Sequence, residues 1–397
     1  MSSGEPVAND AKEFRVLQIY SGNLYGGIET LLVTLAKSRS LFPMIERYFA
    51  ICFPGRLRDE LLAAGAPVYD LGPVRFSRPW TVFRARARLS RLLRDIHFDA
   101  AMTHACWSHT VFAPTIRHEG VRLVHGIHDQ LTGKHWTERL AGRTPPDMVI
   151  ANSHFSAGHG RTVFPDSPME VIYHPLPFQA VKDLTVRERV RAGFGTPRDR
   201  VVFLQASRLE ELKGHSVHIA ALSKLRDEPE WEAWFAGGAQ KSGEQDYLKR
   251  LEAEAIRGGV ADRVKFLGQR SDVPQLMAAA DVYCQPNTGP ESFGFAFVEA
   301  LASGLPVVTS NIGGGAEIVT PECGLLTAPG DAESVAAALR RILREPALRR
   351  VMSQAAPRHA MELCDEHRQL ARRAVVLLGP RATPELRAVA ELPPEPV

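Results

Sequence analysis

Four charged residues in the second half of the sequence have types and spacing that suit a phosphate and a sugar. Arg208 and Lys213 follow the apolar run 201–204, and Glu291 and Glu299 flank the start of a predicted helix over 295–303. Arginine and lysine neutralise a diphosphate, and carboxylates accept hydrogen bonds from hydroxyl groups. The four residues together favour a binding site for a sugar nucleotide. Taken alone, Arg208 and Lys213 would equally suit a solvated loop.

The predicted helix itself supplies a second phosphate-binding feature. Pro290 to Gly294 breaks regular structure, so the helix starts near Phe295 and presents backbone N–H groups at its positive end. Gly304 caps its carboxyl end, and an apolar strand is predicted over 305–309. The glycine-rich turn 311–315 adds backbone amides that can approach a ligand.

Strands and helices alternate along the whole chain, which predicts the α/β class. The predicted strands of the first half cover 14–20, 48–52, 67–70, 98–103, 121–125 and 148–151. Those of the second half cover 200–206, 232–236, 263–267, 282–285 and 305–309. Two Rossmann-like domains facing each other across a cleft are the simplest architecture for this pattern.

Composition shifts set the expected domain bounds. We expect a disordered tail over 1–13, an amino-terminal domain over 14–178 and a carboxyl-terminal domain over 179–358, with the proline-containing segment 173–177 at the junction. Helices are predicted over 332–344, 346–356 and 361–378. Residues 380–397 are rich in proline and show no core pattern, which predicts a second disordered tail.

Polar residues of the first half also stand at strand ends. Gly26 and Gly27 lie in the loop after the first strand, but their spacing is not Gly-x-Gly-x-x-Gly, and a structural turn would look the same. His104 and His128 each follow a predicted strand. A single histidine at such a place is more often structural than functional, so both interpretations stay open.

Composition excludes several classes of protein. The net charge of the 397 residues is only +3, and no basic-aromatic pattern indicates nucleic-acid binding. The five cysteines lie far apart, as expected for free thiols in a reducing cytosol. The polar first 13 residues do not resemble a signal peptide, and no segment is apolar enough to span a bilayer, which favours a cytoplasmic protein.

One helix, predicted over 80–96, has a strongly basic face formed by Arg84, Arg88, Arg91 and Arg94. Its other face keeps apolar residues at helical spacing. The arginines are either the solvated side of a packed helix or a surface that docks on anionic lipid headgroups, which would place the protein on the inner face of a membrane.

The motifs of the second half resemble those of the retaining glycosyltransferases of family four. They are Arg208 with Lys213 and Gly214, the run 291–294 with Glu299, the run 302–308, and Gly313, Gly314 and Glu317 with the run 324–326. The run 26–29 is similar to the amino-terminal turn of that family. The resemblance implies the GT-B fold, a donor bound mainly to the second domain and an acceptor bound mainly to the first. It also implies that the helix over 361–378 crosses back to the first domain.

The resemblance also implies roles for individual residues. Arg208 and Lys213 would hold the diphosphate together with the backbone of Phe293, Gly294 and Phe295. Glu291 would bind the transferred sugar, Glu299 the ribose, and Gly27, beside Gly26, would close over the β-phosphate. His128 would lie near the reacting sugar, with His104 and His125 as rivals. We therefore expect catalytic roles for His128, Arg208, Lys213 and Glu291.

The expected activity is a retaining, metal-independent transfer from a nucleoside diphosphate sugar to a hydroxyl of a glycan or lipid-linked acceptor in cell-envelope synthesis. The sequence has no Asp-x-Asp motif to hold a bridging metal, and no cofactor is expected. The alternatives are a GT-B phosphorylase or epimerase, and a non-catalytic scaffold of the same fold. The run 236–240 departs from the Gly-x-Gly-Pro pattern common in the family, which leaves the donor base open.

Overall fold

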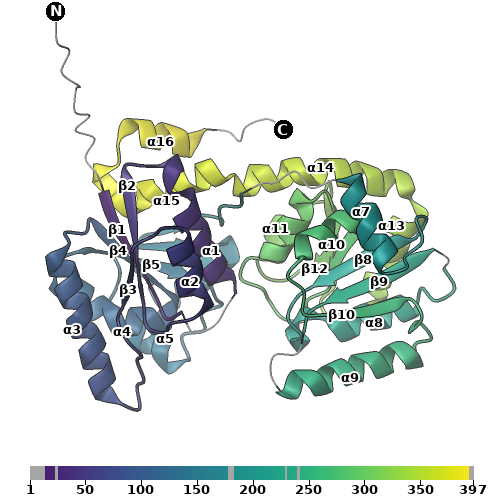
Figure 1. The fold of residues 1–397 in the computed structure, drawn as a ribbon, viewed down its shortest axis with the longest axis horizontal. Coiled ribbons are helices and arrows are strands. Elements are labelled where there is room, and N and C mark those ends of the chain that lie inside the picture. Colours follow the sequence, from purple (N-terminus) through teal and green to yellow (C-terminus); the bar gives the residue numbers. More distant parts are fainter. Residues whose placement is uncertain (1–13, 23–25, 178–182, 229, 239–241, 393–397) are drawn as a thin grey trace, which may run out of the picture. The chain divides into compact units, whose positions relative to one another are not determined.

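A computed structural model describes residues 14–22, 26–177, 183–228, 230–238 and 242–392 (Figure 1). The chain divides into two compact units. Of the described residues, those up to 152, 157–175 and 367–392 form the first unit, and 153–156 and those from 176 to 366 form the second. The tail expected over 1–13 lies outside the described residues.

The first unit is built on a parallel sheet of seven strands in the order β3-β2-β1-β4-β5-β6-β7. The strands are β1 (Phe14–Tyr20), β2 (Ile45–Ile51), β3 (Val68–Asp70), β4 (Ala100–His104), β5 (Arg122–Ile127), β6 (Met148–Ala151) and β7 (Met169–Val171). Strand β7 is three residues long and was not predicted. The order reverses between β1 and β4, which is the switch point of a doubly wound sheet.

Side chains of successive strand residues point to opposite faces of this sheet, and each face has its own apolar core. Helices α1 (Gly27–Lys37), α2 (Arg56–Ala63) and α15 (Glu366–Leu378) bury apolar residues against the face that carries Val16 and Phe49. Helices α3 (Pro79–Asp95) and α4 (Ala105–His118) cover the face that carries Leu17 and Ala50. Two short helices follow later strands, α5 (Trp136–Ala141) and α6 (His154–Gly160).

The second unit contains a parallel sheet of six strands in the order β10-β9-β8-β11-β12-β13. They are β8 (Val201–Ala206), β9 (Trp231–Ala236), β10 (Val264–Gly268), β11 (Val282–Gln285), β12 (Val307–Ser310) and β13 (Gly324–Thr327). Strand β13 was not predicted. The switch point of this sheet lies between β8 and β11.

The helices of the second unit lie on both faces of its sheet. They are α7 (Leu184–Gly193), α8 (His215–Ser223), α9 (Ser242–Arg257), α10 (Val273–Ala279), α11 (Phe295–Ala302), α12 (Gly315–Ile318), α13 (Ala332–Arg344) and α14 (Pro346–Cys364). Helices α8, α9 and α13 share one core with Phe203 and Trp231. Helix α13 begins at Ala332 because the side chain of Asp331 accepts a hydrogen bond from the backbone of Glu333.

The carboxyl-terminal helices differ from the prediction in two ways. The helix expected over 361–378 is broken at Asp365, whose extended ψ of 120° ends α14 and lets α15 start in a new direction. The disorder expected over 380–397 is wrong for residues 384–391, which form α16 (Pro384–Glu391). Helix α16 forms because Thr383 caps its first turn and Leu386 is buried in the first core.

The arginines predicted to line one face of α3 are exposed, as either interpretation of that face requires. Arg84, Arg91 and Arg94 reach solvent, and Arg88 also donates a hydrogen bond to the carbonyl of Leu71. Within the described part of the chain, no helix has the length and apolar character needed to cross a bilayer.

Candidate functional site

The switch point of the second sheet brings the predicted donor residues together. Strands β8 and β11 are hydrogen-bonded neighbours, so the loops after their carboxyl ends start side by side. The first loop carries Arg208 and Lys213, and the second carries Glu291. Residues far apart in sequence thus meet at the sheet edge where ligands bind in this kind of fold.

Lys213 and Glu291 form the centre of this site. The ammonium nitrogen of Lys213 lies 2.8 Å from Oε1 of Glu291, and both side chains are largely shielded from solvent. The other carboxylate oxygen accepts hydrogen bonds from the amides of Gln285 at 3.2 Å and Asn287 at 3.0 Å. Because both oxygens of Glu291 are engaged, its carboxylate is held in a fixed orientation.

A layer of buried polar groups supports these residues. The amide of Gln205 donates to the backbone carbonyl of Lys213 at 2.9 Å, and its oxygen lies 2.9 Å from Nδ1 of His218. The hydroxyl of Tyr283 lies 2.9 Å from Oε1 of Gln285. Gln205, Gln285 and Tyr283 all belong to strands, so the rigid sheet sets the positions of Lys213 and Glu291.

Arg208 lies at the same edge but points elsewhere. Its guanidinium pairs with Glu210 at 2.9 Å, and 55% of its side chain is exposed. An exposed ion pair of this kind contributes about 0 to 1 kcal/mol to stability, so it is easily exchanged for a stronger anion. Arg208 is therefore free to turn toward a diphosphate, whereas Lys213 is already held in place.

Close backbone packing explains the glycines around the start of α11. Gly294 precedes the helix with a φ of +103°, a conformation that disfavours other residues. A Cβ atom on Gly313 would lie 2.5 Å from the carbonyl oxygen of Glu291, and one on Gly314 would lie 2.4 Å from that of Ser292. The glycine-rich turn after β12 therefore fixes the loop that carries Glu291. Phe293 is buried beside Phe295, whose ring meets it edge-on.

Glu299 projects from α11 and is half-buried. Loss of solvent around its carboxyl raises its pKa from the ordinary value to about 7. Near neutral pH this group is therefore divided between its charged and neutral forms. Hydrogen bonds donated by hydroxyl groups of a ligand would favour the charged form.

Gly26 and Gly27 belong to the first unit, at the start of α1. Gly26 is the residue before the helix, and its N–H donates to the carboxylate of Glu29 at 2.8 Å. Glu29 is buried, so the turn is tied to the body of the unit. Residues 23–25 of the same loop lie outside the described residues.

His128 belongs to a cluster of buried imidazoles at the carboxyl ends of β4 and β5. Nε2 of His128 lies 2.9 Å from Nδ1 of His104, and Nε2 of His104 lies 2.7 Å from the side-chain oxygen of Gln18. The ring of His174 stacks on His128 at 5.7 Å. The expected rival His125 belongs to a separate chain of hydrogen bonds through the hydroxyl of Thr103.

The hydrogen bonds fix which nitrogen of each ring carries the proton. The oxygen of Gln18 can only accept, so Nε2 of His104 donates to it. Burial keeps the pKa of His104 well below its usual value and lowers that of His128 to about 3, so both rings are neutral. Nδ1 of His104 is then an acceptor, Nε2 of His128 donates to it, and Nδ1 of His128 is a bare acceptor.

Gly126 makes room for the chain of hydrogen bonds from His128 through His104 to Gln18, which we call the histidine relay. A Cβ atom at that position would lie 2.8 Å from Nε2 of His128 and 3.2 Å from Nδ1 of His104, directly beside their hydrogen bond. Nδ1 of His128 is buried and has no hydrogen-bond partner among the described residues. Nδ1 of His128 can therefore accept a hydrogen bond from a ligand. Because the pKa of His128 is low, the ring carries no extra proton to donate as an acid near neutral pH.

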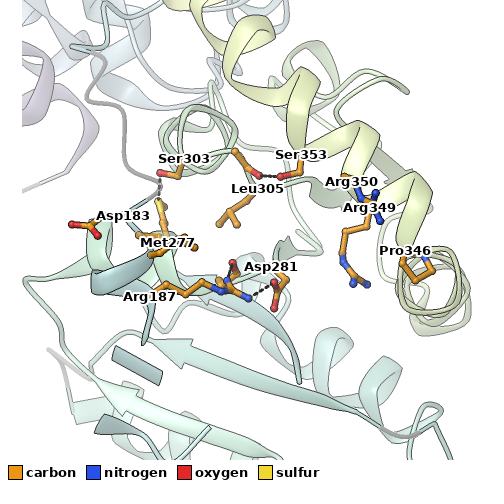
Figure 2. A pocket seen from close by; sticks show the side chains of 14 residues that line it. Asp183, Arg187, Met277, Asp281, Ser303, Leu305, Pro346, Arg349, Arg350 and Ser353 are labelled. Carbon is orange, nitrogen blue, oxygen red and sulfur yellow. Dashed lines mark hydrogen bonds and ion pairs between the residues drawn. The ribbon is translucent and has the colours of Figure 1, made fainter. Parts of the chain in front are cut away.

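A pocket of about 360 Å³ in the second unit lies away from this chemistry (Figure 2). Its lining includes Asp281 and Leu305, which precede β11 and β12 and therefore mark the amino ends of the strands. Arg187 reaches across it and donates to Asp281 at 2.7 Å. The pocket is at the opposite sheet edge from Lys213 and Glu291.

The sequence prediction missed the amides that hold Glu291. Gln285 ends a buried strand and Asn287 follows it, and that position was itself a signal, since polar residues at carboxyl strand ends meet at the ligand edge. Gln18 gave no such signal, because it lies inside β1 between apolar residues. Residues 239 and 240, in the run that departs from the family pattern, lie outside the described residues.

Comparisons with known proteins agree with this geometry. Residues 25–179 match the family Glycosyltransferase Family 4, and residues 186–359 match the family Glycosyl transferases group 1. A D-inositol 3-phosphate glycosyltransferase from Nocardioides is 28% identical over 86% of this chain and 79% of its own length. A phosphatidyl-myo-inositol mannosyltransferase from Mycolicibacterium smegmatis is 37% identical over 39% of each chain.

Solved structures show the same fold. The Anabaena protein HepE, crystallised with UDP and glucose, is 26% identical with a TM-score of 0.80 over 92% of this chain and all of its own. Its complex with UDP-glucose gives 27% identity and a TM-score of 0.78 over 91% of this chain and 99% of HepE. The α/β class and the two Rossmann-like units of the GT-B fold are confirmed. The chain belongs to glycosyltransferase family 4.

Proposed function

We propose that this glycosyltransferase transfers a sugar from a nucleoside diphosphate sugar to a hydroxyl group with retention of anomeric configuration. The observation that carries the proposal is the Lys213–Glu291 pair, fixed by two amides at the switch point of the second sheet. A cation and an oriented carboxylate at this place suit a diphosphate next to a sugar. The structurally similar protein HepE was crystallised with UDP-glucose, which supports the same class of donor for this chain.

In the proposed reaction, the bond between the sugar and the phosphate breaks first, and negative charge develops on the departing diphosphate. Lys213, Arg208 and the start of α11 would stabilise that charge. The leaving phosphate would take the proton of the acceptor hydroxyl. Glu291, held by Gln285 and Asn287, would orient the sugar through its hydroxyl groups.

Nucleotide binding is the first test. A panel of UDP, GDP, ADP and TDP, measured by thermal shift, should give one nucleotide that raises the melting temperature of the wild-type protein. The same nucleotide should have a much smaller effect on a Lys213→Met variant. If no nucleotide stabilises the protein, the proposed donor class is wrong.

Product analysis separates this proposal from its rivals. A transferase releases nucleoside diphosphate when acceptor is present, an epimerase changes the donor without acceptor, and a phosphorylase requires inorganic phosphate. NMR of the product would show whether the anomeric configuration is retained. If the protein is instead a non-catalytic scaffold, Glu291→Ala and Lys213→Ala should not change how it assembles with its partners. No transfer should then occur in the wild type or in either variant.

The proposed reaction needs no bound metal, because Arg208 and Lys213 supply positive charge at the diphosphate. Among the described residues there is no cluster of three side chains suited to hold a metal ion. Transfer should continue in EDTA at the same rate. A loss of activity in EDTA that Mg²⁺ or Mn²⁺ restores would contradict the proposal.

We also propose a membrane-linked acceptor, in the synthesis of a cell-envelope polysaccharide or glycolipid, as two of the relatives' names suggest for those proteins. Helix α3 supports peripheral membrane contact. Trp80 and Phe83 are 60% and 68% exposed on the helix that carries the exposed arginines. Aromatic rings beside basic side chains suit the interface of an anionic bilayer.

Vesicle co-sedimentation tests this contact. The protein should sediment with anionic vesicles at low salt, and an Arg84→Glu, Arg91→Glu double variant should stay in the supernatant. A matched charge change on α9, Lys249→Glu with Arg257→Glu, should leave sedimentation unchanged. Equal sedimentation of both double variants would show that α3 is not the docking surface.

A further inference from the structure

Two buried arginines in the first unit have no counter-charge among the residues that the structure describes. Arg47 on β2 is 9% exposed and Arg373 on α15 is 3% exposed. Neither guanidinium forms a hydrogen bond or ion pair with any described residue, and Nη1 of Arg47 and both Nε and Nη1 of Arg373 are fully enclosed. Burial alone lowers the pKa of each group to about 10, so both stay charged near neutral pH.

A charge enclosed without a partner is among the least favourable arrangements in a protein. The two arginines lie among apolar side chains such as Leu35, Met102 and Leu377, which makes burial of their charge still less favourable. A first unit that keeps both guanidinium groups charged therefore needs a negative charge that none of the described side chains supplies.

Both arginines line one small cavity between the sheet and α15. The cavity has a volume of about 10 Å³, and among the described residues that line it only Gln18, Arg47 and Arg373 have polar side chains. The oxygen of Gln18 already accepts from His104, which leaves its amide nitrogen as a donor. All three polar side chains can therefore offer hydrogen-bond donors to the cavity.

We propose that this cavity binds a single monoatomic anion, with chloride as the occupant, held by Arg47, Arg373 and the amide of Gln18. The volume is close to the space that one water molecule needs, so the fit favours a single small ion over a phosphate or carboxylate group. A water molecule would fit but would leave two positive charges uncompensated. The site is separate from the donor site and does not depend on the proposed transfer reaction.

Anomalous diffraction tests the site directly. Crystals of the wild-type protein grown or soaked in sodium bromide should show an anomalous peak within hydrogen-bonding distance of both guanidinium groups. A peak of water size without anomalous signal would overturn the proposal. Since this measurement uses neither donor nor acceptor, it is independent of whether the protein transfers a sugar.

Thermal unfolding gives a second test in solution. Replacing gluconate, which is too large for the cavity, by chloride at constant ionic strength should raise the melting temperature of the wild type by at least about 2 °C. The Arg47→Met and Arg373→Met variants should lose this difference, while Arg39→Met, at an exposed arginine of the same unit, should keep it. An equal response of all four proteins would show that chloride acts outside the cavity.

Discussion

Nζ of Lys213 and Oε1 of Glu291 lie 2.8 Å apart although 78 positions separate the two residues in the chain. Each follows a strand of the second sheet, and those strands are neighbours at its switch point. The ion pair fixes both side chains at the proposed donor site. Removing either partner should therefore disturb the other.

Replacing either member of this pair should reduce transfer. Lys213→Met removes positive charge next to the diphosphate, and Glu291→Gln weakens the orientation of the sugar. We expect each change to lower kcat/KM by about 10² to 10³. Because the two side chains are in contact, the double variant should lose less than the product of the single losses. Lys249→Met, at an exposed lysine, should keep wild-type kinetics.

Donor affinity should depend on the ionisation of Glu299. Its pKa of about 7 is raised by burial, and ribose hydroxyl groups would bond best to the ionised form. Affinity should therefore rise with pH and level off above the pKa, with binding of a nucleotide sugar about tenfold tighter at pH 8 than at pH 6. Calorimetry would measure it.

The matched control is Glu299→Gln, which keeps a hydrogen-bond acceptor but does not titrate. Its affinity should be independent of pH over the same range. A nucleotide sugar is the appropriate ligand, because a free nucleoside diphosphate takes up a proton in this range itself. A pH dependence that persists in the Gln variant would assign the effect to another group.

A methyl group at Gly214 should unfold part of the proposed donor site. Its φ is +73°, and a Cβ atom there would lie 1.8 Å from the carbonyl oxygen of Pro286. Gly259 has a similar φ of +67°, but open space surrounds its Cβ position. Gly259→Ala should cost about 1 kcal/mol of stability, and Gly214→Ala at least about 3 kcal/mol. Thermal or urea unfolding would measure both.

The two glycine variants also separate strain from function. Gly214 follows Lys213 directly, so Gly214→Ala should weaken nucleotide binding as well as stability. Gly259→Ala should leave nucleotide binding unchanged. Equal losses of stability in the two variants would mean that backbone conformation, and not the contact with Pro286, makes glycine necessary at position 214.

The proton positions in the histidine relay can be observed by NMR. In protein labelled with ¹⁵N-histidine, Nδ1 of His128 should show the chemical shift of an unprotonated nitrogen and Nε2 that of a protonated one. Neither shift should change between pH 5 and 8, because the pKa of His128 is about 3. His128→Gln identifies the signals.

Gln18→Leu should disturb this pattern, because His104 then loses the acceptor that fixes its proton on Nε2. The signals of His128 should then report a mixture of tautomers. His118→Gln, at an exposed histidine, should leave them as in the wild type. If Gln18→Leu has no effect, the relay does not set the tautomer of His128.

Much of the fold could be predicted from periodicity alone. The helix over 295–303 and its glycine C-cap were predicted to within a residue, because Gly304 has a φ of +73° that few other residues adopt. Strands β7 and β13 were missed because Glu170 interrupts the first and Gly324 begins the second, and both residue types are depleted in strands. Helix α16 was missed because its few apolar residues, Leu386 among them, are buried by distant elements.

The site could be predicted only in part. Arg208, Lys213 and Glu291 follow strand ends, so chain order was enough to bring them to one sheet edge. Gln18 and Arg373 could not be found in this way, because a polar residue inside an apolar strand or helix shows its partners only after folding. Chain order also does not say which two strands each strand pairs with in the sheet. The loops that lie next to each other depend on that strand order, which composition does not contain.

The core of the first unit also has a temporal consequence during synthesis. Leu370, Leu377 and Leu386 complete the apolar face that begins with Val16 and Phe49, so the ribosome has made nearly the whole polypeptide before that face can close. The described part of the second unit ends at Glu366. On the nascent chain we therefore expect the later half to reach its native state first, reversing the usual amino-to-carboxyl order.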